Sequence, residues 1–150
     1  MNKPLETSTV TQVAIIVRDI AKSAREFAEF LGAPMPEIRQ TGTVDVAQTK
    51  YRGKPTQARA KLAFFDAGQG LRLELIEPDE HPSTWREYLD SHGEGVHHIA
   101  FGIKGMKQKI DRLGAEGMPL VQTGEYKGGR YAYIDAVAKL KTVIELLEND

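Results

Sequence analysis

The chain repeats itself, and this internal repeat constrains the fold more than any other feature of the sequence. The run QVAIIV at 12–17 corresponds to HIAFGI at 98–103, and an amphipathic helical pattern follows each run. Later in each half, LELIE at 73–77 corresponds to IELLE at 144–148. Patterns that recur in the same order indicate a repeated supersecondary unit, so we expect the two halves to fold alike.

Each half is typical of a βαβββ module, that is, a strand, a helix and about three further strands. We expect the modules to span about residues 10–78 and 96–148, with a linker helix at about 83–91 between them. The predicted fold class is α+β, and residues 1–150 are predicted to form a single domain, because a chain of this length can bury one sizeable core.

Local signals place the helices within this scheme. Asp19 is the expected N-cap of the first helix, and Gly32 and Gly114 are the expected stops of the first and second helices. In the linker helix, Trp85 and Leu89 lie four residues apart, a spacing that puts both side chains on one face, toward the core.

Composition excludes several classes of protein. The chain has 20 Lys and Arg against 21 Asp and Glu, a net charge of -1, which disfavours a dedicated nucleic-acid surface. It has no cysteine, which excludes disulfides, iron–sulfur clusters, thiolate zinc sites and cysteine nucleophiles. No apolar run approaches the roughly 18 residues of a membrane span, and the first ten residues lack the apolar stretch of a signal peptide. We therefore expect a soluble, cytoplasmic protein that binds neither nucleic acid nor a membrane.

Four polar residues occupy equivalent positions in the repeated strands. Side chains alternate between the faces of a strand, and the bulky apolar residues of these strands lie in the opposite phase. The four are Gln12, Glu74, His98 and Glu145. Singly, each is typical of a solvated strand face or of a histidine satisfied within a core. Together, one imidazole, two carboxylates and an amide oxygen at repeat-equivalent positions predict a divalent metal site.

These strands and their polar residues resemble the vicinal oxygen chelate superfamily, which includes glyoxalase I, methylmalonyl-CoA epimerase and the extradiol dioxygenases. The resemblance implies two tandem βαβββ modules that form a U-shaped mixed sheet around a metal, and a homodimer. It also implies that Gln12, Glu74, His98 and Glu145 are the metal ligands, with Zn, Co, Ni or Mn as the ion. In such families one carboxylate acts as the base, and here the resemblance implies that role for Glu145.

Two subfamilies compete for the function. The linker at 82–89 and the double histidine of GVHHIA at 95–100 resemble methylmalonyl-CoA epimerases, so we expect an isomerase with an acyl-CoA thioester substrate and a metal-stabilised enolate. The set Gln, Glu, His, Glu is similar to that of some glyoxalase I enzymes, and the alternative is a lactoylglutathione lyase or a related thiol-adduct lyase. A non-catalytic binder is a third possibility, whereas a ring-cleaving dioxygenase would need two histidines and one carboxylate.

Three further expectations concern the stretch from 43 to 61 and the second half. Residues 43–46 could form a strand. The resemblance to epimerases implies a second acid on the strand before the first hairpin turn, but the matching stretch at 59–63 contains no acid. Lys61 is the nearest ionisable residue there, and Asp45 is an alternative. Basic side chains could bind an anionic ligand or could simply be solvated turns. These basic residues are Lys50, Arg52, Lys54, Arg59, Lys61 and, separately, Arg130.

Overall fold

The computed structural model describes residues 2–150, so Met1 lies outside the described residues. The first half contains β1 (Gln12–Ile16), α1 (Ile20–Leu31), β2 (Arg39–Gln40), α2 (Val44–Ala47), β3 (Lys50–Tyr51), β4 (Lys54–Pro55), β5 (Ala60–Asp66) and β6 (Arg72–Pro78). After α3 (Thr84–His92), the second half contains β7 (Gly95–Gly102), α4 (Met106–Ala115), β8 (Leu120–Tyr126), β9 (Gly129–Asp135), α5 (Val137–Leu140) and β10 (Val143–Asn149).

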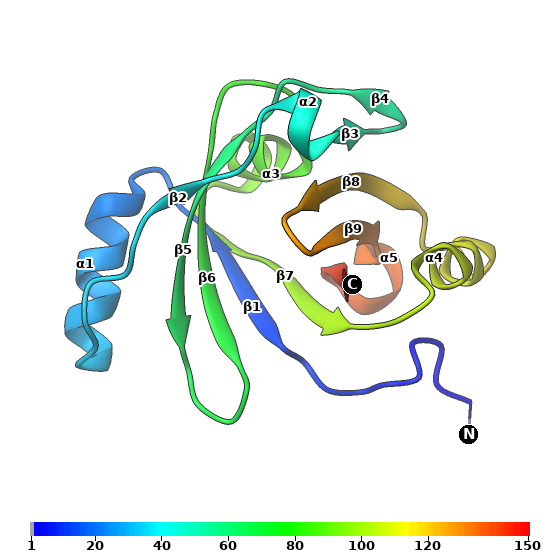
Figure 1. The fold of residues 1–150 in the computed structure, drawn as a ribbon, viewed down its shortest axis with the longest axis horizontal. Helices are drawn as coiled ribbons and strands as arrows, with labels where there is room; N and C mark the ends of the chain where they lie inside the picture. The colour runs from blue at the N-terminus through cyan, green and yellow to red at the C-terminus, as the bar shows by residue number, and fades with distance from the viewer. Residues whose placement is uncertain (1) are drawn as a thin grey trace.

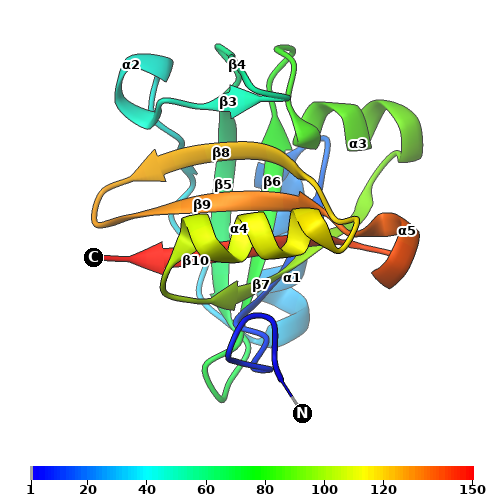
Figure 2. The same cartoon turned by 90° about the vertical axis from the view of Figure 1, so that its right-hand side faces the viewer.

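The strands form one mixed sheet in the order β2-β5-β6-β1-β7-β10-β9-β8-β3-β4. The halves meet where β1 pairs antiparallel with β7. On each side of this seam lies a parallel neighbour, β6 or β10, and then its antiparallel partner, β5 or β9. The sheet curls strongly. In Figure 2, β8, β9 and β10 run horizontally, whereas β5 and β6 run vertically. The predicted α+β class and paired-module sheet are confirmed.

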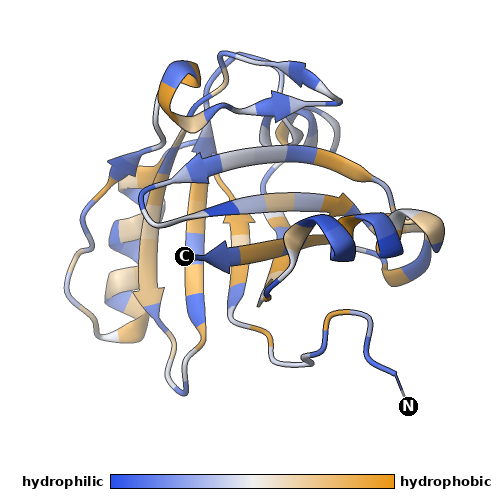
Figure 3. Ribbon diagram, turned by 45° about the vertical axis from the view of Figure 1, so that its right-hand side comes forward, coloured by the Kyte–Doolittle hydropathy of each residue, from blue (hydrophilic) through white to orange (hydrophobic). Residues whose placement is uncertain are grey.

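Helices α1 and α4 lie on the outside of the curled sheet, one against each half (Figure 1). Apolar clusters under these two helices form the outer layer, with Ala24 and Phe65 in the first and Leu113 and Ile134 in the second. A third cluster fills the inside, where Trp85 from α3 packs with residues of both halves. Apolar and polar segments alternate along the strands in Figure 3, as the period of two requires. Among the described residues, no helix is long and apolar enough to cross a membrane.

The helix signals at Asp19 and Gly32 are confirmed. The Asp19 side chain accepts a hydrogen bond from the Lys22 N–H at 3.1 Å, and Gly32 caps the end with a left-handed φ of 63°. The predicted stop at Gly114 is wrong, because α4 continues to Ala115. The left-handed residue after α4 is Gly117, with φ of 86°, so the chain turns three residues later than the first glycine.

The linker helix is confirmed as α3, with both of its expected core residues buried. The Ser83 hydroxyl caps it by accepting from the Arg86 N–H at 2.9 Å. Trp85 and Leu89 are 2% and 5% exposed. Because this helix packs on the inside of the sheet between the two halves, its indole lies within reach of the polar strand faces.

The strand expected at 43–46 is wrong, since Val44–Ala47 form the short helix α2. The β-branched residues favour a strand, but Val46 is 67% exposed and only Ala47 of this helix is buried. A local hydrogen bond from the Thr43 hydroxyl to Asp45 supports the helical turn instead. The chain then forms a β3–β4 hairpin that pairs with β8 of the other half.

Two glycine substitutions test the pairing of β9 with β10. A Cβ added at Gly129 would lie 2.5 Å from the backbone oxygen of Glu148, which cannot move without opening the β9–β10 ladder. We expect Gly129→Ala to lower the free energy of unfolding by about 1–3 kcal/mol, measured by urea denaturation. Gly114→Ala is the matched control, because it has open space within a helix and should gain about 0.5–1 kcal/mol. Equal effects at the two sites would contradict the strand pairing.

Candidate metal centre

Strand register brings the four predicted ligands into two rows across the middle of the sheet. In one row, Ala14 on β1 lies between Glu74 on β6 and His98 on β7. In the next row, Ala100 on β7 lies between Gln12 on β1 and Glu145 on β10. Each alanine is fully buried and ends at Cβ, so the longer side chains beside it can lean over it toward one another.

Three of the four side chains meet closely. The Nε2 atom of His98 lies 3.6 Å from Glu74 Oε1 and 3.4 Å from Glu145 Oε1. The exposed fractions of these residues are 0%, 6% and 4%, and Gln12 is 4% exposed. The strand phase expected from the sequence therefore matches the structure, and the solvated-face interpretation of these positions does not.

The arrangement leaves two buried polar atoms without a hydrogen-bond partner among the described residues, Glu74 Oε1 and His98 Nε2. An unsatisfied buried acceptor costs about 1–3 kcal/mol, more when the group is charged. One imidazole nitrogen and two carboxylate oxygens, from His98, Glu74 and Glu145, lie within 4.8 Å of one another, with no thiolate. This donor set and its open acceptors fit a divalent cation with nitrogen and oxygen ligands.

The neighbouring histidine contacts one ring nitrogen of His98. The Nδ1 atoms of His97 and His98 lie 2.8 Å apart, and His97 Nε2 lies 3.1 Å from the Thr84 hydroxyl. If His98 Nδ1 carries the proton and donates to His97, the lone pair of His98 Nε2 faces the two carboxylates. Burial lowers the pKa of His98 to about 3, so the ring is neutral and able to act as a ligand.

Burial has the opposite effect on the carboxyl groups. It raises the pKa of Glu145 to about 8, against a hydrogen bond from Tyr133 and the charge of Arg72, which both lower it. Burial and the neighbouring Glu145 carboxylate raise the pKa of Glu74 well above its ordinary value. Two such groups side by side resist ionisation unless a positive charge lies between them.

The sequence analysis gave no role to two residues that lie beside the cluster. Tyr133 on β9 is paired in register with Glu145, and its hydroxyl accepts a hydrogen bond from Trp85 Nε1 at 3.0 Å. Because that oxygen already accepts from the indole, its own proton is free for Glu145. Arg72 is the register partner of Gln12. The alternation of side chains along the strands could have identified both residues. Arg72 lies on the same face of β6 as Glu74, and Tyr133 is the register partner of Glu145.

The expected second acids lie elsewhere. Lys61 is paired with Glu77 at 3.6 Å, and Glu77 accepts from the Ile20 N–H at the start of α1, so this pair is on the outer face. Asp45 is exposed on α2 and bonded to Thr43. Neither residue belongs to the cluster around His98.

Some of the basic residues considered as a ligand site have acidic partners. Arg52 binds Glu87 at 2.9 Å. Arg130 binds Glu148 at 3.0 Å and also binds Asp150. These pairs favour the interpretation as solvated turns at Arg52 and Arg130, whereas Lys50, Lys54 and Arg59 have no acidic partner at ion-pair distance among residues 2–150.

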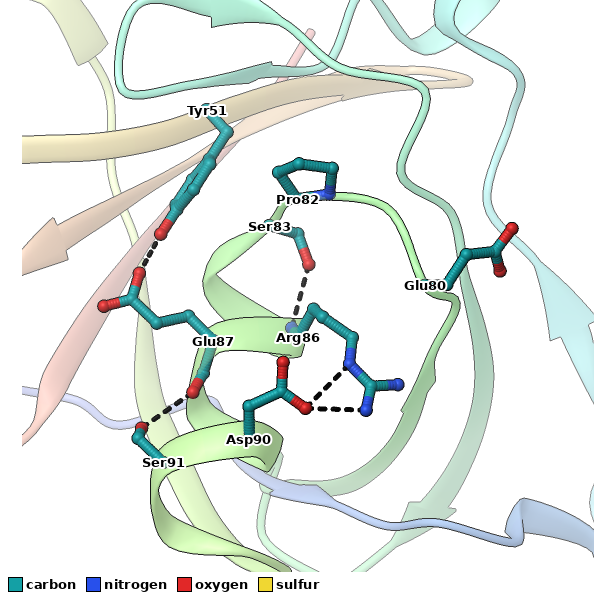
Figure 4. Close-up of a pocket in the computed structure, with 8 residues that line it drawn as sticks. All are labelled: Tyr51, Glu80, Pro82, Ser83, Arg86, Glu87, Asp90 and Ser91. Carbon is teal, nitrogen blue, oxygen red and sulfur yellow. Dashed lines mark hydrogen bonds and ion pairs between the residues drawn. The ribbon is translucent and has the colours of Figure 1, made fainter.

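A surface hollow lies beside α3 and the tip of β3, and it is distinct from the four predicted ligands (Figure 4). Two of its charged side chains pair, since Arg86 binds Asp90, and the Tyr51 hydroxyl donates a hydrogen bond to Glu87. Ser91 donates to the backbone oxygen of Glu87 at 2.7 Å. The residues that line the hollow are Tyr51, Glu80, Pro82, Ser83, Arg86, Glu87, Asp90 and Ser91.

Comparisons with known proteins agree with this architecture. Residues 11–134 match the family model of the Glyoxalase/Bleomycin resistance protein/Dioxygenase superfamily. The uncharacterized protein YqjC of Bacillus subtilis (strain 168) is 30% identical over 95 residues, which cover 61% of this chain and 67% of that protein.

Solved structures share the fold at low identity. Methylmalonyl-CoA epimerase from Mycobacterium tuberculosis is similar with a TM-score of 0.62 and 22% identity, over 94% of this chain and 87% of that chain. A variant of the Streptomyces coelicolor methylmalonyl-CoA epimerase in complex with 2-nitronate-propionyl-CoA has a TM-score of 0.63 and 18% identity, over 95% and 94%. At these identities the likeness establishes the fold alone.

The carboxyl pKa values predict how stability responds to pH and to a cation. The pKa of Glu145 is raised to about 8 from 4.5, so its contribution to stability is fully present below pH 4.5 and is lost as the pH rises toward 8. We expect the melting temperature of chelator-treated protein to fall between pH 5 and pH 8, measured by thermal unfolding. Saturating divalent cation should raise it more at pH 8 than at pH 5, because binding favours the ionised carboxylates.

Glu145→Gln is the variant that checks this assignment, since its side chain does not titrate. It should remove much of the fall with pH in the chelator-treated protein. A fall that is unchanged in this variant would show that other groups titrate, and the assignment of the pH dependence to Glu145 would be wrong.

Proposed function

The chain belongs to the Glyoxalase/Bleomycin resistance protein/Dioxygenase superfamily, and within it we propose that the protein is a metal-dependent epimerase that interconverts the stereoisomers of methylmalonyl-CoA. The observation that carries the proposal is the convergence of two buried carboxylates on one neutral imidazole, with open acceptor atoms on Glu74 and His98. Similarity of the fold to methylmalonyl-CoA epimerases supports the choice of substrate.

The residues of the cluster divide the work of cation binding and proton transfer. Glu74, His98, Glu145 and the amide oxygen of Gln12 would hold the ion, which when bound supplies Lewis acidity toward the thioester carbonyl. Glu145 takes the proton from the carbon beside that carbonyl. Its burial strengthens it as a base relative to a solvated carboxylate, and Tyr133 fixes the direction of its lone pairs.

Epimerisation also requires a proton donor on the opposite face of the planar enolate. Glu74 and Glu145 come from β6 and β10, which flank the central pair β1 and β7 on opposite sides. Glu74 is thus the carboxyl group placed across the cluster from Glu145, and we assign to it the return of the proton. Because a carboxylate that binds a cation is ionised, Glu74 can carry this proton only while its carboxyl group is not bound to the ion.

Several finer features go with this proposal. The ion would be Zn, Co, Ni or Mn, because nitrogen and oxygen ligands suit all four and supply decides among them. The substrate would be an acyl-CoA thioester, as in the complex of the similar Streptomyces coelicolor enzyme with 2-nitronate-propionyl-CoA. The protein would work as a homodimer in the cytoplasm.

A lyase of the glyoxalase I type is the second candidate. Among the described residues, the cluster around His98 contains two carboxylates and no third. Transfer of a proton between adjacent carbons of a thiol hemithioacetal can use a single base, so this chemistry leaves Glu74 free to act as a ligand throughout.

The decisive experiment is deuterium incorporation at C2 of methylmalonyl-CoA in D₂O, followed by NMR with and without divalent cation. We expect cation-dependent exchange, and Glu145→Gln should lower its rate by about 10²–10⁴-fold because the base is lost. Glu125→Gln, at an exposed position on β8, is the control and should exchange normally. Full activity of Glu145→Gln would refute the assignment of the base. Turnover of a methylglyoxal–thiol adduct without C2 exchange would favour the lyase.

Removal of the imidazole tests the metal centre directly. His98→Ala should lose stoichiometric divalent cation, measured by elemental analysis after dialysis, because it deletes the nitrogen ligand of the cluster. The matched control is His92→Ala, since His92 lies at the exposed end of α3. Stoichiometric metal in purified His98→Ala would place the ion elsewhere in the protein.

A further inference from the structure

Arg72 stands out because it is a charged side chain in the same row as the predicted ligands. On β6 it is the register partner of Gln12, in the row that continues through Ala100 to Glu145. Its guanidinium lies over the ring of Phe64, 4.4 Å from the ring centre, and Phe64 is paired in register with Glu74. The aromatic face holds the guanidinium beside the cluster, while the residue as a whole remains exposed.

No carboxylate neutralises this guanidinium at ion-pair distance within residues 2–150. Its close partner is the amide of Gln12, whose oxygen, in the orientation that satisfies both ends, accepts from Arg72 Nη2 at 2.6 Å. In that orientation the amide nitrogen donates to Glu145 Oε1 at 3.2 Å. By contrast, the other arginines near the inner strands, Arg52 and Arg130, are each bound to an acidic side chain.

The Gln12 oxygen cannot serve Arg72 and a cation at the same time. An amide that turns its oxygen toward a cation beside Glu145 turns its nitrogen toward Arg72, and two donors then face each other. Arg72 thereby loses its acceptor when the centre is loaded. A guanidinium that is exposed, held by an aromatic ring and without an acceptor is suited to bind an incoming carboxylate in a bidentate manner.

Comparison of the two repeats shows that the positive charge of Arg72 is present on only one side of the centre. The position equivalent to Arg72 in the second half is Val143, which pairs with His98 as Arg72 pairs with Gln12. The ligands follow the pseudo-twofold relation between the halves, whereas the positive charge does not. The structure therefore offers an anionic group of a ligand this positive charge only on the side of β6.

We propose that Arg72 binds the free carboxylate of the substrate, and that the site therefore selects thioesters of 2-carboxy acids over thioesters that lack this group. This inference rests on the proposed function and identifies the chemical group of the substrate that Arg72 recognises. The carboxylate beside the reacting carbon is the chemical feature that separates these thioesters from neutral hemithioacetals.

The test compares two ligands that differ by this one group. Calorimetric titration of Mn²⁺-loaded protein gives the dissociation constants of methylmalonyl-CoA and of propionyl-CoA, which has the same acyl chain without the carboxylate. We expect Arg72→Met to weaken binding of methylmalonyl-CoA by about 10–100-fold and to leave that of propionyl-CoA within about twofold. Arg72→Lys keeps the charge but not the planar fork, so its loss should be intermediate.

Two controls keep the comparison specific. Arg25→Met removes the same charge from the exposed face of α1 and should change neither constant. Elemental analysis of Arg72→Met should show stoichiometric metal, so that both ligands are titrated against a loaded centre. An equal loss for both ligands, or no loss for methylmalonyl-CoA, would overturn the proposal.

Failure of the proposed function gives a different result. If the parent protein binds neither thioester, the acyl-CoA assignment falls, and the same variants are titrated with malonate, a free dicarboxylate. Binding of malonate that is lost in Arg72→Met and kept in Arg25→Met would support Arg72 as the carboxylate anchor for a different substrate. Malonate that binds both proteins equally, or neither of them, would overturn it.

Discussion

The centre of this protein depends on the contact between the two halves, where β1 pairs antiparallel with β7. This seam sets Ala14 beside His98 and Ala100 beside Gln12, and the parallel strands β6 and β10 then add Glu74 and Glu145 to the same two rows. A shift of one residue would turn every polar side chain of the shifted strand to the outer face. The alanines matter as much as the ligands, because larger residues in the same rows would occupy the space where the ligands meet.

Helix α3 connects this centre to the rest of the molecule. Its residue Thr84 bonds His97, which in turn bonds His98. The next residue, Trp85, bonds Tyr133, whose hydroxyl faces Glu145. The linker between the repeats therefore orients both an imidazole and a carboxylate of the cluster. This places the first histidine of the pair against Nδ1 of the second, so that Nε2 of His98 faces the carboxylates.

Much of the site could be predicted from the alternation of side chains along each strand, because this alternation depends on local geometry alone. Gln12, Glu74, His98 and Glu145 share a face because each lies out of phase with its bulky apolar neighbours. Predictions from the sequence were wrong where the same residues are compatible with more than one secondary structure. The stretch at 43–46 has strand propensity but forms α2, and α4 passes through Gly114 to end next to the later Gly117. Lys61 is a candidate second acid from its place in the chain, yet its partner Glu77 binds the start of α1.

The sequence by itself determined the repeat, the two βαβββ modules and the inward phase of the four polar residues, because these follow from short-range periodicity. The tertiary structure decided which strands are neighbours, and hence that Arg72 contacts Gln12 while Tyr133 contacts Glu145. It also decided the electrostatics, because burial by residues distant in the chain neutralises His98 and raises the pKa of both carboxyl groups. Desolvation depends on everything packed around a group, and no local pattern in a sequence contains that information.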